Sequence, residues 1–507
     1  MRTDVVDGLR ASLGPPPAEL RETHMSWVLL TEDRAYKLKK PVSFDFLDLS
    51  EPAARKAACE EEVRVNAALA GDVVLGLRAV VARDGGYALD GDDAEAVDWV
   101  VEMRRFDEAD TMASAVERGD LTREQVAATA QRIAAFHASA ERPPAEDWSA
   151  LVAQTWRVNV EELERAAGRW VAPERIAAAR RFAESTARRR AGELDRRAAA
   201  GLVVDGHGDL RAEHVLLGGP QVTIVDRLEF DWRLRRVDVA DDLAFLVMDL
   251  SALGAEWAAD ALVDAYREAG GDPGDPGLIA AFAWYRAQVR AKVGLLRADQ
   301  LPADAAGRAR DAALDLLALS ERFTWAARGP LVLVVAGPPA SGKSTVAGAL
   351  RDAGGLPVLS SDVVRKDLLG IPAGQPAPAD AYTPEARRAI YAELGARATE
   401  VSRDGPVVVD ATFGDEGQRD AFLEGLGEGG LDRVRLVVCE APLEVRVERA
   451  RARAAAGGSA SDAGPDVVRR LGDASVGLPV PPAHRLVLDT TGPVGEVAAT
   501  VSAWLDA

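Results

Sequence analysis

The sequence predicts two domains: an α+β domain of two lobes over residues 1–328, and an α/β domain with a mainly parallel sheet over residues 329–507. Short strand patterns near the start of the chain are followed by long helical patterns, as expected for a β-rich lobe and a helical lobe. From Leu331 onward, short apolar strand patterns alternate with helical segments, which is typical of a buried parallel sheet. The segment Arg328-Gly329-Pro330 separates the two patterns and indicates the domain boundary.

The composition is that of a large globular protein, with 48% hydrophobic and 28% charged residues among 507. The first residues, MRTDVVDGLR, lack the apolar core of a signal peptide, and no apolar run near Leu331 approaches the roughly 20 residues that span a bilayer. The two cysteines, Cys59 and Cys439, are too few for a disulfide framework and favour a reducing compartment. We therefore expect a cytoplasmic protein without membrane contact. The net charge of −20 disfavours binding of bulk nucleic acid, since neither half of the chain is basic.

The first lobe is predicted to contain a β-hairpin, a helix and a further strand. Two strand-like runs flank a polar turn at residues 32–34, and a helix should start after Ser50 as its cap, with Pro52 close behind. The predicted bounds are Ser26–Thr31 and Ala35–Val42 for the hairpin, Glu51–Ala70 for the helix and Val97–Met103 for the strand.

Helices and a second hairpin are predicted for the rest of the first domain, in the order of a kinase-like fold. The hairpin follows the segment His207–His214 and would bring Asp209 and Asp226 to neighbouring strand ends. The predicted strands are Leu202–Asp205, Val215–Leu217 and Val222–Asp226, and the predicted helices are Thr122–Ala140, Ala145–Ala199, Asp238–Ala269, Gly277–Arg297 and Ala303–Ala326.

Five strands are predicted for the second domain, all short and largely apolar. A stretch rich in Gly, Ser, Ala and Asp, residues 454–465, is expected to be a mobile loop. The predicted strands are Leu331–Ala336, Val358–Ser361, Val407–Asp410, Arg435–Cys439 and Arg485–Asp489.

A phosphate-binding P-loop is predicted at the start of this domain, because GPPASGKST follows an apolar strand and opens a helix. Its backbone N–H groups would surround phosphate oxygens, Lys343 would reach the β and γ phosphates, and Ser344 would offer its hydroxyl to Mg²⁺. ATP and Mg²⁺ are therefore the expected cofactors. The expected nucleotide-binding residues are Gly337, Pro338, Pro339, Ala340, Ser341, Gly342, Lys343, Ser344 and Thr345.

Five polar positions after the P-loop could complete a catalytic site. Asp362 ends a strand and Arg365 lies one helical turn later, so they could accept a proton from an acceptor hydroxyl and bind an anion; a capping aspartate and a solvated arginine are the alternative. Asp410 could hold a magnesium-bound water, touch substrate, or only cap a strand end. Arg449 and Arg453, spaced i,i+4, could clamp the transferred phosphate or be ordinary surface arginines.

The motifs GPPASGKST, SSDVVRK, VVVDATF and ERARAR give residues 331–507 a resemblance to the small P-loop kinases. This group includes gluconate kinases, zeta-toxin-like kinases and polynucleotide 5′-kinases. The resemblance implies phosphoryl transfer from ATP to a hydroxyl and does not select the acceptor. Motor ATPases of the AAA+ type are a weaker match, because Asp410 is followed by Ala411 and not by glutamate.

The first domain carries its own candidate site around the motif HGDLRAEH. Asp209 and Asp226 have the spacing of a catalytic-loop aspartate and a magnesium-binding aspartate. Further upstream, Lys37 and Lys39 alternate onto one face of a strand and Glu62 lies on the following helix, as in the lysine–glutamate pair that positions ATP phosphates. Either lysine could be the partner of Glu62.

The motifs YKLKKPV, FLDLS, HGDL and DDLAFLVMDL make residues 20–325 similar to the aminoglycoside phosphotransferase and choline kinase superfamily. They are particularly similar to a bacterial group that fuses such a domain to a P-loop kinase. The resemblance implies that Asp209 accepts the proton of the substrate hydroxyl and Asp226 binds Mg²⁺. His137 and His207 would be structural, and Asp238 and Asp242 would brace the catalytic loop or cap a helix.

One position departs from that superfamily: His214 stands five residues after Asp209, where an asparagine normally supplies a metal ligand. Mg²⁺ prefers oxygen ligands and imidazole suits softer metals. His214 is thus a weak candidate ligand for a second Mg²⁺. One-metal catalysis through Asp226, another role for His214, and a domain that binds nucleotide but transfers slowly are the three possible outcomes.

Together these features predict a bifunctional ATP-dependent phosphotransferase that acts on a hydroxyl of a small molecule. One alternative is a pseudokinase-like first domain that regulates or scaffolds the second. Another is a polynucleotide 5′-hydroxyl kinase, which the acidic net charge disfavours.

Overall fold

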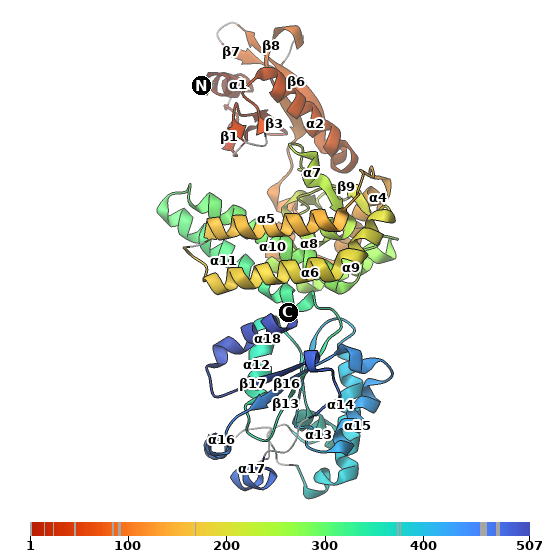
Figure 1. Ribbon diagram of the computed structural model, residues 1–507. Coiled ribbons are helices and arrows are strands. Elements are labelled where there is room, and N and C mark those ends of the chain that lie inside the picture. Colours follow the sequence, from red (N-terminus) through yellow and green to blue (C-terminus); the bar gives the residue numbers. More distant parts are fainter. Residues whose placement is uncertain are drawn as a thin grey trace. The chain divides into compact units, whose positions relative to one another are not determined.

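The structure is a computed structural model that describes residues 3–14, 16–23, 25–44, 47–83, 86–89, 93–167, 169–372, 375, 377–456, 464–472 and 477–507. Its contacts divide the chain into unit 1, Met1–Trp148 with Gly192–Pro273, and unit 2, Ser149–Ala191 with Gly274–Ala507. The predicted fold class is confirmed in its architecture: an α+β region is followed by an α/β domain with a parallel sheet (Figure 1). The domain boundary expected near residue 328 falls between helix α11 and strand β13. The division into domains 1–328 and 329–507 stays a prediction.

Unit 1 begins with a six-stranded antiparallel sheet in the order β1-β2-β3-β8-β6-β7. The predicted hairpin is present as β2 and β3, in which Trp27 pairs with Leu38. Strand β1, with the sequence ELRE, has no apolar alternation, and its pairing with β2 makes it a strand. The bounds are β1 Glu19–Glu22, β2 Ser26–Leu30, β3 Arg34–Lys39, β6 Val74–Arg83, β7 Gly86–Ala88 and β8 Ala96–Arg104; helix α1, Thr3–Ser12, precedes the sheet.

Helix α2 (Pro52–Ala70) packs against this sheet and presents Glu62 to it. Its N-cap is Glu51 and not the predicted Ser50, and no side chain caps the helix. Proline at the first helical position needs no N–H partner, so the helix starts there without a capping bond.

The second part of unit 1 is helical and carries the predicted second hairpin, β10 and β11. The helix predicted over Asp238–Ala269 is two helices, because the chain turns at Gly254 with a left-handed φ of 76°. The bounds are α3 Met112–Arg118, α4 Arg123–Ser139, β9 Val203–Asp205, β10 Val215–Leu216, β11 Thr223–Ile224, α7 Trp232–Arg235, β12 Arg236–Asp238, α8 Val239–Ala252 and α9 Glu256–Glu268.

Unit 2 begins with a helical layer. The helical region predicted over Ala145–Ala199 is interrupted before Pro173, which starts a new helix. Aromatic side chains join these helices, with the rings of Trp156 and Trp284 5.5 Å apart and those of Phe182 and Trp284 4.8 Å apart. The bounds are α5 Trp148–Ala167, α6 Pro173–Ala199, α10 Pro276–Ala298 and α11 Ala303–Ala326.

All five predicted strands of the second domain are confirmed and form a parallel sheet in the order β14-β15-β13-β16-β17. The three central strands β13, β15 and β16 are buried on both faces and are nearly all apolar. The strands are β13 Val332–Ala336, β14 Val358–Ser360, β15 Val407–Ala411, β16 Val434–Glu440 and β17 Arg485–Asp489. The helices are α12 Lys343–Gly354, α13 Ser361–Leu369, α14 Pro384–Val401, α15 Glu416–Leu426, α16 Leu443–Ala456, α17 Pro465–Leu471 and α18 Val497–Leu505.

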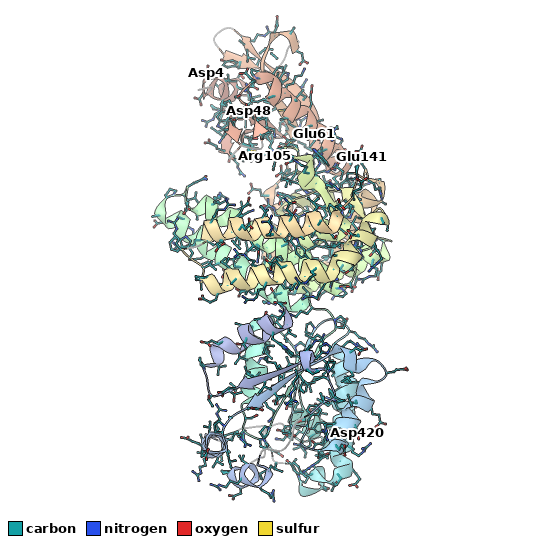
Figure 2. All side chains as sticks on the ribbon, viewed as in Figure 1. Asp4, Asp48, Glu61, Arg105, Glu141 and Asp420 are labelled. Carbon is teal, nitrogen blue, oxygen red and sulfur yellow. The ribbon has the colours of Figure 1, made fainter. Side chains whose placement is uncertain are left out.

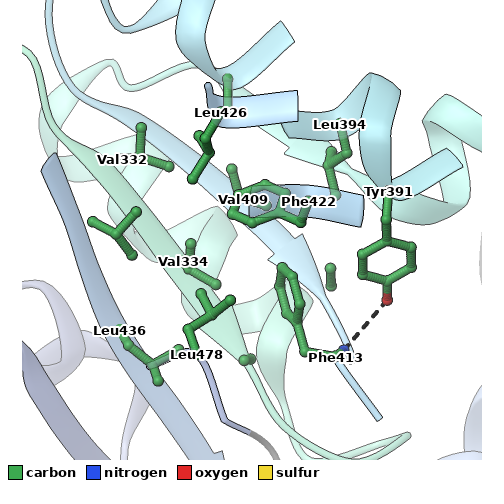
Figure 3. Packing of buried hydrophobic residues seen from close by; sticks show 14 of the residues in the cluster. Val332, Val334, Tyr391, Leu394, Val409, Phe413, Phe422, Leu426, Leu436 and Leu478 are labelled. Atoms are coloured by element: carbon green, nitrogen blue, oxygen red, sulfur yellow. Dashed lines mark hydrogen bonds between the residues drawn. The ribbon is translucent and has the colours of Figure 1, made fainter. Parts of the chain in front are cut away.

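Two apolar clusters cover the faces of this sheet. On one face, Val334 and Val409 pack with Phe413 and Phe422 (Figure 3). On the other face, helix α12 packs onto the sheet, and Trp325 from the end of α11 joins that cluster. The fold of the P-loop domain therefore includes a side chain from the preceding helix.

Residues 457–463 of the predicted loop lie outside the described residues, and helices α16 and α17 stand on either side. Within the described part of the chain, none of the helices combines the length and apolar character that crossing a membrane requires. Exposed acidic side chains such as Asp48, Glu141 and Asp420 occur in both units (Figure 2).

Candidate active sites

The P-loop of unit 2 joins the buried strand β13 to helix α12. Gly337 and Gly342 have φ values of 152° and 94°, and a Cβ on Gly337 would lie only 2.4 Å from the carbonyl oxygen of Cys439. Glycine is therefore required for this close approach of backbone to backbone. Lys343 starts the helix, and its ammonium donates a 3.0 Å hydrogen bond to the carbonyl oxygen of Pro338.

The P-loop fits a bound triphosphate and a metal ion. Burial lowers the pKa of Lys343 and raises the pKa of Asp410, so each would gain from a partner of opposite charge. The Ser344 hydroxyl donates a 2.7 Å hydrogen bond to Asp410, which places two oxygen ligands suited to Mg²⁺ side by side. The buried Ser341 hydroxyl oxygen has no hydrogen-bond partner among the described residues. A phosphate would satisfy such groups, and Mg²⁺ would neutralise charge on the phosphates.

Asp362 and Arg365 lie on α13 and face the same cavity. The helix is capped by Ser360, whose hydroxyl accepts from the Asp362 N–H, so the alternative that Asp362 is the cap is wrong. Arg365 Nη1 donates to Asp362 Oδ1 at 2.5 Å, and its guanidinium lies 4.8 Å from the ring centroid of Tyr382. The predicted carboxylate–arginine pair therefore exists as a contact within the helix.

Arg449 on α16 is held beside the P-loop. It donates to the carbonyl oxygen of Thr490 at 2.6 Å, and the Thr490 hydroxyl donates to the Ser341 carbonyl oxygen at 2.6 Å. Arg453 follows one turn later on the same helix. Arg449 is thus fixed by the chain after β17 and does not point freely into solvent.

A cavity of about 1140 Å³ brings the predicted residues of unit 2 together. Two arginines that the sequence reasoning missed also line it, Arg387 on α14 and Arg470 on α17. The predicted residues that line it are Pro338, Pro339, Ala340, Gly342, Lys343, Ser344, Thr345, Asp362, Arg365, Asp410, Arg449 and Arg453.

Polar groups that were not predicted from the sequence also lie near the end of β15. Phe413 has a left-handed φ of 49°, which is strained for an aromatic residue. The hydroxyl of Tyr391 accepts from the Phe413 N–H at 3.3 Å (Figure 3) and lies 3.0 Å from the Thr412 hydroxyl. Tyr391 and Thr412 both line the cavity, so the strained turn sets the position of polar groups in it.

The candidate site of unit 1 contains the predicted lysines and Glu62 in direct contact. Lys37 lies 2.8 Å from Glu62 Oε1 and 3.1 Å from Asp226 Oδ1. Lys39 lies 2.6 Å from Glu62 Oε2 and also pairs with Glu229. Both lysines therefore bind Glu62, and Lys37 alone of the two also reaches Asp226.

Asp226 follows the β10–β11 hairpin with a left-handed φ of 62° and a half-exposed side chain. The charge of Lys37 holds the pKa of the Asp226 carboxyl well below its ordinary value. A carboxylate held ionised in a strained conformation suits a metal ligand. The next residue, Arg227, was not singled out from the sequence; it donates to the Val65 carbonyl oxygen and so joins this segment to α2.

Asp209 is held by a residue that the sequence reasoning also missed. Arg211 Nε lies 3.1 Å from each carboxylate oxygen of Asp209. His214 Nδ1 lies 2.8 Å from the Asp209 carbonyl oxygen, and His214 Nε2 lies 3.0 Å from Arg211 Nη2. Both ring nitrogens of His214 are thus engaged within the protein, which does not suit the metal-ligand role considered from the sequence.

The residues expected to brace the loop do so. Asp242 accepts from the N–H groups of His207 and Gly208 at 2.6 and 2.9 Å, and His137 Nε2 lies 3.1 Å from the same carboxylate. Asp238 caps α8 by accepting from the Ala240 N–H. These contacts orient the loop that carries Asp209.

Comparisons with known proteins found a family model that matches part of the chain and a relative that matches most of it. A family model described as an AAA domain matches residues 332–474. The "Uncharacterized protein Rv2004c" of Mycobacterium tuberculosis (strain ATCC 25618 / H37Rv) is 32% identical over 486 residues, covering 94% of this chain and 93% of the relative.

Two solved structures illustrate the similarities of the separate parts. A gluconokinase from Sinorhizobium meliloti 1021 is 24% identical, covers 35% of this chain and 91% of its own, and has a TM-score of 0.25. A choline/ethanolamine kinase family protein from Mesorhizobium loti is 15% identical, covers 60% of this chain and 92% of its own, and has a TM-score of 0.32.

Proposed function

This chain belongs to the family of the mycobacterial protein Rv2004c, and from that premise we propose that it is an ATP-dependent phosphotransferase with a small-molecule hydroxyl acceptor. The observation that carries the proposal is the cavity of unit 2, where the P-loop, Asp362 and Asp410 meet. Phosphoryl transfer needs positioning and charge stabilisation more than covalent chemistry, and this cavity offers both.

Each predicted site residue that lines the cavity of unit 2 has a role in this proposal. Lys343 and the backbone N–H groups at the start of α12 bind the phosphates, and Ser344 with Asp410 would hold Mg²⁺. Asp362 accepts the proton of the acceptor hydroxyl, and Arg365 keeps that carboxylate in place through their 2.5 Å contact. Arg449 and Arg453 stabilise charge on the transferred group.

The experiment measures ATP consumption by the full-length protein against a library of hydroxyl metabolites, with mass spectrometry for an added phosphoryl group. Lys343→Ala should remove transfer to any acceptor used by unit 2, and Asp362→Asn should remove it while ATP binding persists. A partly exposed lysine of α2, Lys56, serves as the control in Lys56→Ala. Transfer that survives Lys343→Ala undiminished would assign the activity to another site.

Unit 1 supplies a second candidate function, nucleotide binding with slow or no transfer. His214 favours it, because both of its ring nitrogens are engaged within the protein and this position does not supply the oxygen ligand that a second Mg²⁺ prefers. Transfer to any library compound that depends on Asp209 and persists in Lys343→Ala would instead make the protein bifunctional. We place the protein in the cytoplasm, with no bulk nucleic acid among its partners.

A further inference from the structure

The candidate nucleotide site of unit 1 does not fit a second divalent cation. In protein kinases, the second metal ligand is an asparagine on the catalytic loop. Here that position is His214, and its Nδ1 faces the Asp209 carbonyl oxygen at 2.8 Å. A carbonyl oxygen only accepts, so Nδ1 carries the proton, and the lone pair on Nε2 faces Arg211 Nη2 at 3.0 Å. The imidazole therefore has no free lone pair for a metal.

A guanidinium already supplies positive charge at this place. Arg211 Nε lies 3.1 Å from both oxygens of Asp209, and its Nη1 pairs with Glu213. The Arg211 side chain is only 16% exposed, so its charge is poorly screened by water. A divalent cation that binds the Asp209 carboxylate would have to displace this guanidinium from it.

Asp226 remains as a suitable ligand. Its carboxylate is half exposed, faces Lys37 at 3.1 Å, and lies 3.6 Å from His214 Nε2. Among the described residues there is no cluster of three or more His, Cys, Asp or Glu side chains that could hold a metal by themselves. A single cation at Asp226 would depend on the phosphates for its other ligands, as Mg²⁺ often does.

We propose that unit 1 binds ATP with one divalent cation, at Asp226, and that Arg211 takes the place of the second cation beside Asp209. The inference rests on the nucleotide site of unit 1 in the proposed function. Unlike a metal ion, the arginine charge is permanent and cannot be removed by a chelator.

The test counts Mn²⁺ bound with the non-hydrolysable ATP analogue AMP-PNP, by the paramagnetic resonance signal of free Mn²⁺. The full-length Lys343→Ala protein is used, so that nucleotide bound at the P-loop is suppressed. We expect one Mn²⁺ per bound AMP-PNP in this protein, and two when Arg211→Ala and His214→Asn are added together. The matched control is Arg64→Ala, an exposed arginine of α2, which should leave the count at one.

The possible results of this experiment lead to different conclusions. Two Mn²⁺ with Arg211 and His214 intact would overturn the inference but keep the nucleotide site. One Mn²⁺ in the folded double variant would overturn the role of these two residues. Absence of AMP-PNP binding would reject the nucleotide site of unit 1 and the inference with it. If the double variant unfolds, His214→Asn alone should remain at one Mn²⁺, since Arg211 is kept, and two would overturn its role.

Discussion

Lys37 and Lys39, two residues apart on β3, bind opposite oxygens of the Glu62 carboxylate, at 2.8 and 2.6 Å. They differ in their second partner, because Lys37 reaches Asp226 whereas Lys39 pairs with Glu229. The Lys39 side chain is 2% exposed and its charge is neutralised within the protein. The Lys37 side chain is 16% exposed, so we expect Lys37 to be the lysine that binds a nucleotide.

This difference predicts that matched substitutions of the two lysines affect different properties. Lys37→Met should weaken nucleotide binding by unit 1 about tenfold, the loss of one charge-assisted bond, with little effect on stability. Lys39→Met should lower the free energy of unfolding by about 3–5 kcal/mol, since Glu62 and Glu229 lose a buried partner. Nucleotide titration and urea unfolding, both in the Lys343→Ala protein, measure the two effects. The reverse pattern would make Lys39 the phosphate-binding lysine.

Asp410 should control the metal requirement of unit 2. Asp410→Asn keeps the size of the side chain and removes the charge beside Ser344, so we expect the Mg²⁺ concentration needed for half-maximal ATP turnover to rise about 10–100-fold. Turnover measured against Mg²⁺ concentration gives this shift. Asp420→Asn, on the exposed face of α15, is the control and should not change it. An unchanged Mg²⁺ response of Asp410→Asn would remove Asp410 from the metal site.

The Tyr391 hydroxyl should matter for transfer more than for nucleotide binding. Tyr391→Phe removes its contacts with the Phe413 N–H and the Thr412 hydroxyl, and should lower the free energy of unfolding by about 1 kcal/mol. Because Thr412 lines the cavity, phosphoryl transfer should fall while ATP affinity is kept. Thr412→Ser retains a hydroxyl and should transfer more than Thr412→Val. Equal transfer by these two variants would show that the hydroxyl has no part.

The buried pair between Arg328 and Asp506 should make the end of the chain important for stability. Arg328 Nη2 lies 3.1 Å from Asp506, and the two side chains are 5% and 3% exposed. Asp506→Ala leaves the guanidinium buried without its anion, so the free energy of unfolding of unit 2 should fall by about 3–5 kcal/mol. Unfolding in guanidinium chloride measures this loss of stability, and Glu428→Ala, at an exposed position, is the control. A loss equal to that of the control would contradict the pairing.

His207 should make unit 1 less stable in mild acid. Burial lowers the pKa of its imidazole from 6.5 to about 4, although the negative charge of Asp242 opposes this. Between these values the unfolded chain binds the extra proton, so stability falls as pH drops from about 6.5 toward 4, by up to about 3 kcal/mol.

The check compares urea midpoints at pH 7 and pH 5 for the native chain and His207→Gln. The groups that face His207 are Asp242, Asp209 and His214, and all three stay in the variant. The variant should lose most of the difference between the two pH values. A pH dependence that His207→Gln leaves unchanged would assign it to those neighbours.

The sequence alone determined features that depend on local patterns. The central strands of the parallel sheet are apolar on both faces, and the P-loop needs glycines at fixed offsets from a lysine. Both patterns can therefore be recognised from the sequence. The hairpin between Asp209 and Asp226 was predictable for the same reason. Strand β1 was not, because its sequence ELRE becomes a strand only through pairing with β2.

The tertiary structure decided which side chains meet. Lys37 and Lys39 are equivalent in sequence, and only the packing of α2 and the second hairpin gives one of them Asp226. Arg211 looks like a surface residue until the loop folds it against Asp209 and His214. Such contacts either join segments that are far apart in sequence or occur within a loop where the chain turns sharply. Local periodicity carries no information about either kind of contact. The sequence therefore identified the two modules, and the tertiary structure assigned partners to the charges within them.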